Sequence, residues 1–458
     1  MLAVIRTYAF SAMLLGLAAL MLFNYGFQMV RVPPSGIGVP YIELLLFACA
    51  PFLLSRSSAR QLLRSSWFTP VLIWQVWGGA RILADASEKG VVAIRDGLPV
   101  LESIFFFVGF ALFTRRWVVE AIVRYLPVFC WLVLAYAMTH PFSETLTELS
   151  PKLMNFQNKP VPLFFKYINT GALLICSAAY LWIRGMQRMT VNQFVPGLFV
   201  TTALIFFPSR TIILQCVAVV GFFVLTMPAS QRPRRFSLIM MVLVAILGLV
   251  AVTSSDIQVA GRLGVLELSD YTRLIQEMDW RGGSGSAATI TSGTADRMMW
   301  WTDIVHRVTA SWMTFLFGLG FGEPLINFYV HGDVVVREPH NTLVSVFGRL
   351  GIIGLVIYLY MTVSIIGLCI KQVHRRLLDS QLGPLVAFIS VFILATLVSG
   401  IGEPPFINPF NTVTYFFGVG ILACMDSQRA AKLDVQLLSG SPRENSGAEN
   451  GLSESPPS

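Results

Sequence analysis

Three ionisable side chains stand directly before a long apolar stretch in the second half of the chain. Arg337, Glu338 and His340 come first, and the residues that follow are almost wholly apolar through Tyr360. An imidazole exchanges protons near neutral pH, and a guanidinium makes bidentate contacts with phosphate or carboxylate oxygens. This combination suits acid–base chemistry on an anionic molecule that also contacts a hydrophobic surface.

The composition places this polar cluster in a membrane protein. Of the 458 residues, 55% are hydrophobic and only 13% are charged, whereas an ordinary soluble domain is about 25% charged. Apolar runs of about 20 residues predict spanning helices, because a helix satisfies its backbone polar groups internally. The six cysteines all lie in apolar runs without CxxC spacing. They are expected to be buried thiols, and we expect no metal site.

We therefore predict an all-α, polytopic integral membrane protein with about twelve transmembrane helices. The apolar runs cover residues 8–30, 37–54, 67–84, 98–114, 117–138, 163–183, 193–209, 211–228, 236–254, 345–370, 382–402 and 411–425. With both termini in the cytoplasm, most Lys and Arg residues of the short connections lie on the cytoplasmic side. The same bias explains the pI of about 9.3, so no nucleic-acid partner is expected.

This topology defines the domain organisation. Residues 1–425 form one transmembrane domain, which includes the long extracytoplasmic loop of residues 255–343 between the ninth and tenth helices. Residues 426–458 are polar and rich in Ser, Pro and Gly, which predicts a disordered cytoplasmic tail. No internal repeat is visible in the sequence.

The extracytoplasmic loop contains a Gly/Ser-rich stretch and then an amphipathic pattern. Residues 281–297 read RGGSGSAATITSGTADR, which is typical of a flexible linker and lacks the residues of a phosphate loop. A helix is expected to begin near Asp296 and Arg297 and to end at FGLGFG, residues 317–322. Four apolar residues share one face of it at i, i+4 spacing: Trp300, Ile304, Val308 and Trp312. We expect this face to lie on the membrane surface.

Ionisable residues inside apolar runs also gather at one side of the predicted membrane. Six of them fall at the outer leaflet: Glu43, Arg81, Glu102, Lys166, Arg210 and His340. Each such residue is costly near the bilayer and needs a structural or functional reason. Single cations can extend to the headgroups, but the six together favour a polar chamber open to the outer face. Such a chamber suits an anionic ligand carried by a lipid.

Two short patterns in the second half of the chain resemble those of the O-antigen ligase superfamily, which includes O-antigen and exopolysaccharide polymerases. The first is His-Asn, nine residues, Gly, two residues, Gly; the second is Arg-x-x-x-Leu. Their fixed positions are occupied by His340, Asn341, Gly351 and Gly354, and by Arg210 and Leu214. The resemblance extends over residues 195–425 and includes the predicted helix layout and long outer loop.

Further details of the loop and of the tenth helix bear on this resemblance. An Arg followed by a Trp in the outer loop, here Arg297 and Trp300, is similar to the family as well. Arg349 is a departure, because many relatives carry an acidic residue there. The departure concerns the acceptor side of the reaction.

The resemblance implies an inverting, metal-independent glycosyltransferase without a cofactor, in the bacterial inner membrane, with its active site facing the periplasm. Its donor would be a glycan carried on undecaprenyl diphosphate. A ligase would move the glycan onto the lipid A core, and a polymerase would move it onto another lipid-linked repeat unit. Other partners would be membrane lipids.

The resemblance also assigns roles to residues. His340 would be the general base, and Arg210 and Arg297 would bind the donor diphosphate. Second-tier candidates are Arg337, Glu338, Arg81 and Lys166. Glu338 is a candidate to orient the imidazole. Apolar runs would form a groove for the polyprenyl tail.

Alternatives from other classes remain open at this point. A polysaccharide transporter or flippase would place its substrate site near the bilayer midplane and usually shows repeated halves. A scaffold subunit of an envelope-polysaccharide complex would have no chemistry of its own. A peptidoglycan-type polymerase would use a similar donor but does not match the His340 motif. Of the two family activities, the sequence slightly favours ligase.

Overall fold

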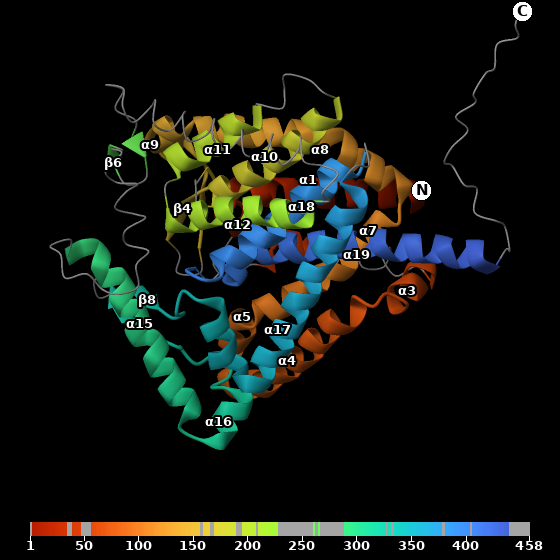
Figure 1. Ribbon diagram of the computed structural model, residues 1–458. Coiled ribbons are helices and arrows are strands. Elements are labelled where there is room, and N and C mark those ends of the chain that lie inside the picture. Colours follow the sequence, from red (N-terminus) through yellow and green to blue (C-terminus); the bar gives the residue numbers. More distant parts are fainter. Residues whose placement is uncertain are drawn as a thin grey trace, which may run out of the picture.

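The computed structural model is mostly helical (Figure 1). It describes residues 2–33, 39–46, 56–155, 159–164, 169–188, 195–207, 209–227, 260–261, 264–265, 288–326, 328–330, 334–377, 381–403 and 405–438. The longer helices are α1 (Leu2–Phe23), α4 (Phe68–Lys89), α7 (Phe105–Phe113), α8 (Arg116–Met138), α10 (Asn169–Arg188), α11 (Val195–Phe206), α12 (Arg210–Thr226), α15 (Ala288–Thr309), α17 (Thr342–Arg376), α18 (Gly383–Ser399) and α19 (Pro409–Leu438).

The remaining elements are short and connect these helices. They are the helices α3 (Arg56–Leu63), α5 (Val91–Asp96), α6 (Leu98–Leu101), α9 (Ser143–Leu149) and α16 (Trp312–Phe317), and the 3-10 helices η1 (Phe27–Met29), η2 (Glu102–Ile104), η3 (His140–Phe142) and η6 (Pro405–Ile407). Four antiparallel hairpins pair β1 (Arg31–Val32) with β2 (Val39–Pro40), β3 (Lys152–Met154) with β4 (Pro160–Pro162), β5 (Ala260–Gly261) with β6 (Gly264–Val265), and β7 (Phe328–Val330) with β8 (Val334–Val336).

The predicted all-α class is confirmed as a mostly helical fold. Among the described residues, α8 and α17 are long and apolar enough to cross a membrane, and shorter apolar helices accompany them. The fourth predicted run is divided into α6, η2 and α7. Residues 236–254, the ninth predicted run, lie outside the described residues. The number of spans and the side of the membrane therefore stay predictions.

The helices form a bundle from which one arm extends. In Figure 1, α8, α10, α11, α12 and α18 run side by side, whereas α4 and α17 cross obliquely beneath them. Helices α15 and α16 form the arm, which meets the bundle at the beginning of α17. One apolar core joins the bundle helices, and a small second core lies under α15.

The end of α17 that was predicted to be cytoplasmic is held by a buried carboxylate. Asp426 of α19 accepts from Lys371 Nζ at 2.6 Å, Arg375 Nη1 at 3.3 Å and Trp67 Nε1 at 2.9 Å. These residues come from α17 and from the start of α4. Asp426 therefore ties α19 and the start of α4 to this end of α17, and His340 lies just before the opposite end of α17.

Helix α17 is broken at Gly351, which has a φ of 65°. The break leaves carbonyl groups of the preceding turn for other donors. Gly348 accepts from the backbone of Leu319 at 2.8 Å, and Arg349 accepts from Gly320 at 3.1 Å. The loop after α16 therefore packs directly on the break, and a side chain at position 351 would lie 2.4 Å from the Leu316 carbonyl oxygen. The motif glycine is explained by both its conformation and this close approach.

Three boundaries differ from the sequence-based prediction. Helix α15 begins at Ala288, so the second half of the expected linker is helical. Its apolar face continues only to Val308, because Ser311 caps a separate helix that begins with Trp312. The face of Ile304 and Val308 packs on protein and not on the membrane surface. Helix α19 continues through Leu438, past the expected start of the disordered tail, and the rest of that tail lies outside the described residues.

We expect Gly351→Ala to lower the free energy of unfolding by at least about 2 kcal/mol, because a side chain would be strained at this φ and would meet the Leu316 carbonyl. Gly367 is a matched control in the same helix, with no atom near its added side chain. Gly367→Ala should be neutral or stabilising by about 0.5–1 kcal/mol. Thermal unfolding of the two purified variants in detergent measures the difference, and equal midpoints would contradict it.

Candidate functional site

The site is built at the first turn of α17. Asn341 is the N-cap, and its Oδ1 accepts from the Val344 backbone at 3.1 Å. The same side chain donates through Nδ2 to the Ile401 carbonyl at 3.0 Å, and the Thr342 backbone donates to Gly400 at 2.8 Å. The second motif residue therefore starts the helix and also fixes the segment after α18 beside it.

His340 is held in an unusual backbone conformation, with a φ of 52°. A non-glycine residue in this region costs about 1–3 kcal/mol and persists only where its surroundings fix it. The preceding carbonyl, of Pro339, accepts from Trp301 Nε1 at 2.7 Å. The Trp300 ring lies 6.3 Å from the imidazole, centroid to centroid. Helix α15 thus contacts both the backbone and the ring of the motif histidine.

Glu403 is the carboxylate that contacts His340. Its Oε2 lies 3.2 Å from His340 Nδ1, and its Oε1 lies 3.7 Å from Arg297 Nη2. All three side chains are about one-third exposed. A carboxylate at Nδ1 accepts the proton there, so that Nε2 carries the lone pair and can take up a proton. The structure therefore brings together His340, predicted as a base, and Arg297, predicted as a diphosphate ligand.

Sequence reasoning missed Glu403 and considered Glu338 for this position. Glu338 points elsewhere: its Oε2 accepts from Ser345 Oγ at 3.0 Å, and its Oε1 pairs with Arg349 Nη2 at 2.5 Å. Proximity in the chain favoured the wrong carboxylate. A signal was present, because Glu403 stands at the outer end of the eleventh predicted helix, on the same predicted side as His340.

Arg210 is the first residue of α12, directly after the N-cap Ser209. Helix α12 packs along α18 through Gln215, whose Nε2 donates to Ser399 Oγ at 2.7 Å. A methyl group placed at Gly402 would lie 3.8 Å from Arg297 Nη1 and 4.0 Å from Thr211 Oγ1. The start of α12 and Arg297 therefore flank the segment that carries Glu403. Both predicted diphosphate ligands lie at this end of the bundle.

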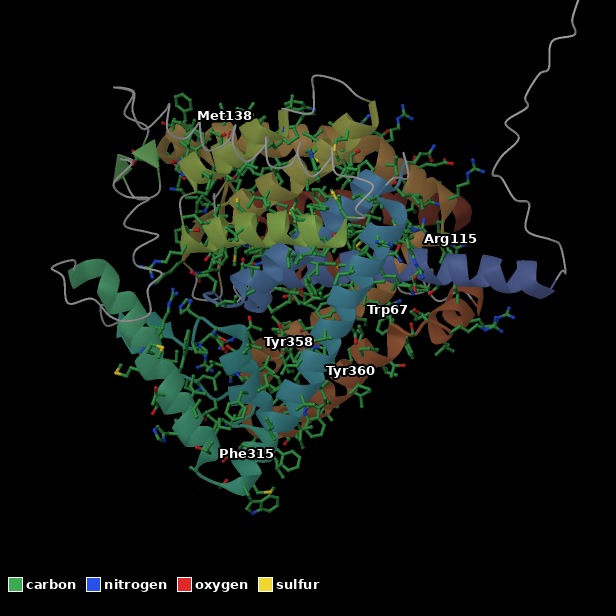
Figure 2. All side chains as sticks on the ribbon, in the orientation of Figure 1. Trp67, Arg115, Met138, Phe315, Tyr358 and Tyr360 are labelled. Atoms are coloured by element: carbon green, nitrogen blue, oxygen red, sulfur yellow. The ribbon has the colours of Figure 1, made fainter. Side chains whose placement is uncertain are left out.

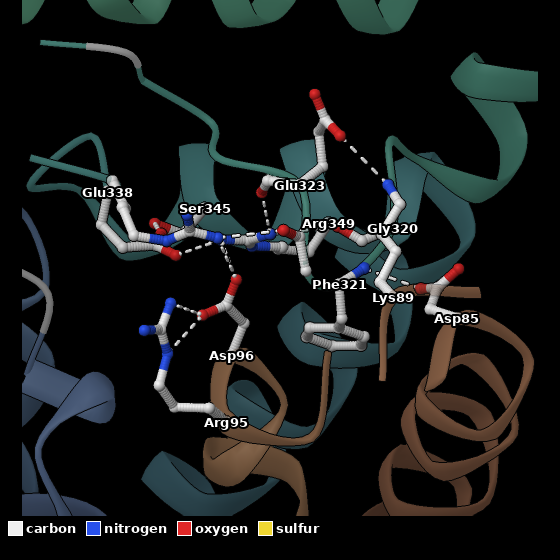
Figure 3. A network of polar contacts seen from close by, with 12 residues as sticks. Asp85, Lys89, Arg95, Asp96, Gly320, Phe321, Glu323, Glu338, Ser345 and Arg349 are labelled. Carbon is white, nitrogen blue, oxygen red and sulfur yellow. Dashed lines mark hydrogen bonds and ion pairs between the residues drawn. The ribbon is translucent and has the colours of Figure 1, made fainter. Parts of the chain in front are cut away.

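The second-tier candidates Arg337 and Glu338 belong to a partly buried charge cluster. Figure 3 shows Arg95, Asp96, Glu338 and Arg349 of this cluster. We call Arg95, Asp96, Arg337, Glu338 and Arg349 the Asp96 cluster. Asp96 Oδ2 lies 3.0 Å from Arg337 Nη2 and 3.2 Å from Arg349 Nη2, and Oδ1 lies 2.8 Å from Arg95. These groups bind one another, which gives them a structural part in the site.

Arg349, where the sequence departs from the family pattern, is buried in this cluster with 4% of its surface exposed. Its Nη1 donates to the carbonyls of Gly320, at 3.2 Å, and of Glu323. The residue thus joins α17 to the loop that follows α16. Its burial and these contacts give Arg349 a packing role.

The predicted polar chamber is not formed as one site. Arg81 pairs with Asp85 at 3.1 Å, and Asp85 accepts from the Phe321 backbone at 2.7 Å. Glu43 and Glu102 lie close to each other, and their carboxylate oxygens are buried. Lys166 lies outside the described residues. Of the five outer ionisable residues that the structure describes, Arg210 and His340 lie at the Glu403 segment.

Part of the chain matches a known protein family. A family model described as O-antigen ligase matches residues 195–359, a segment that contains Arg210, Arg297 and His340. The match supports a relationship of this segment to the O-antigen ligase superfamily. A search of curated proteins finds no significant match. The match indicates O-antigen ligase- or polymerase-type function in general, and the apolar helices are those of a membrane protein.

The electrostatics of the Asp96 cluster predict how the stability of the protein changes at low pH. Burial alone would raise the pKa of Asp96, but the guanidiniums of Arg349, Arg95 and Arg337 hold the pKa below its usual value. A carboxyl with a lowered pKa in the folded state stabilises the protein above its unfolded-state pKa. That stabilisation is lost as the pH falls below about 4 and through the folded-state pKa.

We expect Asp96→Asn to lower the free energy of unfolding by about 1–3 kcal/mol at neutral pH, because the buried Arg349 loses one of its two carboxylate partners and the partly exposed Arg95 and Arg337 lose theirs. The difference from the native chain should shrink as the pH falls below about 4. Asp303 is the control, since it is largely exposed and lies 3.8 Å from Arg307. Asp303→Asn should change little at any pH. Thermal unfolding across a pH series tests this, and a pH-independent loss for Asp96→Asn would contradict it.

Proposed function

We propose that the protein is an O-antigen ligase-like glycosyltransferase. It moves a glycan from undecaprenyl diphosphate to a sugar hydroxyl of the lipid A core, at the periplasmic face of the bacterial inner membrane. The observation that carries the proposal is that one carboxylate, Glu403, contacts both His340 and Arg297. A base for the acceptor and a cation for the leaving diphosphate are thereby held side by side within the matched family segment.

The base is His340. Its Nδ1–H donates to Glu403, which fixes the ring and stabilises the imidazolium that forms during the reaction. Nε2 removes the proton of the acceptor hydroxyl while that oxygen attacks the anomeric carbon. The bond from this carbon to the diphosphate oxygen breaks on the opposite face, so that the configuration inverts. General-base catalysis of this type contributes about 10²–10⁴-fold.

The leaving group is stabilised by Arg297 and Arg210. A guanidinium has several N–H donors and keeps its charge at any physiological pH. The 3.7 Å separation of Arg297 and Glu403 is longer than a charge-assisted hydrogen bond of about 2.7–2.9 Å. Arg297 can therefore turn its donors to diphosphate oxygens without losing a strong bond. Two fixed cations at the departing oxygens replace the divalent metal that many glycosyltransferases use for this purpose.

The polyprenyl tail requires an apolar path along the bundle. A groove of about 380 Å³ lies between α1, α8, α18 and α19, and its walls include Leu17, Phe129, Phe388 and Phe417. Met21 and Phe392 line it and also line a small cavity that contains Ser399. Ser399 directly precedes the segment that carries Glu403. We propose that the tail lies along this path, with its diphosphate at the arginines.

We expect His340→Ala to lower transfer by about 10²–10⁴-fold. Glu403→Gln should give a smaller loss, because the imidazole keeps a hydrogen-bond partner but loses the charge that stabilises it. Arg297→Lys should raise the KM for the donor, since lysine lacks the bidentate geometry. His306→Ala is the control for the first variant, as this exposed histidine lies on α15. Glycan transfer by the purified protein in vesicles provides the measurement. Near-native transfer by His340→Ala would exclude His340 as the general base.

Ligase and polymerase are distinguished in cells by the glycans that accumulate when the gene is deleted. Mass spectrometry would quantify glycans on undecaprenyl diphosphate and on the lipid A core. Long chains on the carrier with a bare core indicate a ligase. Single repeat units on the carrier, with long chains gone, indicate a polymerase. Unchanged pools, in a strain without a second family member, would contradict both.

A further inference from the structure

Helix α16 shows an apolar surface that the described part of the protein leaves exposed. None of its six residues is buried. Trp312 is 70% exposed, Met313 49% and Phe315 40%. The helix is nevertheless firmly placed, because Ser311 and Thr314 form a capping box and Thr314 Oγ1 donates to the Val308 carbonyl at 2.8 Å. The exposed rings and the thioether are therefore presented by an ordered element.

The neighbouring helix α15 buries one apolar face against the protein. Ile304 and Val308 are fully buried against Leu325 and Ile326, with Trp300 packed beside them. The outer face of α15 is mixed: Thr302 and His306 are exposed on it, and so are the apolar Met298, Met299 and Val305. The exposed aromatic residues of the arm, Trp312 and Phe315, lie on α16, after the turn between the two helices. The apolar side chains of α16 need a different partner.

The surface of α16 continues onto the surface of α4 and α17. The Phe317 ring stacks on Trp77 of α4 at 5.9 Å, and Phe315 lies edge-on to Phe347 of α17 at 6.3 Å. Along the same two helices, exposed apolar residues include Val76, Leu83, Val356, Tyr360 and Val363. Figure 2 shows Phe315 at the tip of the arm and Tyr360 farther along α17. Since α17 is long and apolar enough to cross a membrane, we expect the exposed apolar residues along it to face lipid.

We propose that α16 is seated in the bilayer interface, with Trp312 and Met313 in contact with lipid. Tryptophan is enriched at headgroup depth, and an amphipathic segment lies in the interface with its apolar side in the acyl region. The occupant is a lipid surface because the patch is the end of the lipid-facing side of α4 and α17. The contact gives the arm a second attachment, at the corner between α15 and the loop that binds the α17 break.

The attachment has a consequence for the site. Helix α15 carries Trp301, which holds the Pro339 carbonyl, and Arg297, which lies beside Glu403. At its other end, α15 meets α16. A lipid contact at α16 therefore restrains the end of α15 that adjoins it, and Trp300 of α15 lies beside the His340 ring. This inference concerns where the arm lies and does not depend on the proposed reaction.

The experiment places a fluorophore on each helix of the arm in the full-length protein. A bimane is attached to Met313→Cys and, as the matched control, to Thr302→Cys, in vesicles of phosphatidylethanolamine and phosphatidylglycerol. Nitroxide lipids report contact with the bilayer, and iodide reports contact with water. Background from the native cysteines is measured on the unsubstituted chain treated in the same way.

We expect nitroxide lipids to quench the label at position 313 at least about twofold more than the label at 302, and iodide to show the opposite order. Iodide quenching at 313 equal to that at 302, without nitroxide quenching, would overturn the proposal. Protection at 313 from both quenchers would indicate a protein partner or a second copy and would also overturn it. If Met313→Cys fails to fold, Trp312→Phe replaces it: the native chain should lose more fluorescence to brominated lipids than this variant, and equal losses would contradict the proposal.

Discussion

The burial of charge beside the start of α17 is the constraint on which the rest of the structure depends. A buried carboxylate or guanidinium is tolerated only when its partners are present. Asp96 is contacted by guanidiniums from three positions in the chain, and Arg349 also holds Glu338 and the carbonyl of Gly320. The corner after α4, the loop after α16 and the segment before His340 must therefore assemble together. Each of them forms part of one rigid support.

This support explains how a strained histidine is maintained. The backbone of His340 lies in a region that is costly for a side chain with a Cβ. Glu338 is fixed on one side of it, and Asn341 is fixed on the other by its bonds to Val344 and Ile401. Trp301 holds the carbonyl between them. The conformation directs the imidazole to Glu403, away from the apolar part of α17, and the surrounding bonds offset its cost.

The sequence predicted those features that follow from local pattern. Runs of apolar residues indicated α8 and α17, and the motif singled out His340, Asn341 and Gly351 before their geometry was known. The pattern could not predict the pairing of His340 with Glu403, since 63 residues separate them and a single chain carries no record of which carboxylate approaches. The spacing of apolar residues also extended the predicted amphipathic face of α15 to Trp312. This extension was wrong, because the capping box at Ser311 begins a separate helix although the helical spacing continues.

Helix α15 couples the two halves of the proposed reaction. Arg297, Trp300 and Trp301 lie within little more than one helical turn, so one element carries the cation for the diphosphate and the contacts that shape the base. Ile304 and Val308 tie the following turns to the protein core. A displacement of this helix would weaken donor binding and release the Pro339 carbonyl at the same time. In the proposed reaction, His340 would be correctly held as the base only when the helix that carries Arg297 is in place, which would link proton removal to the cation proposed to stabilise the leaving group.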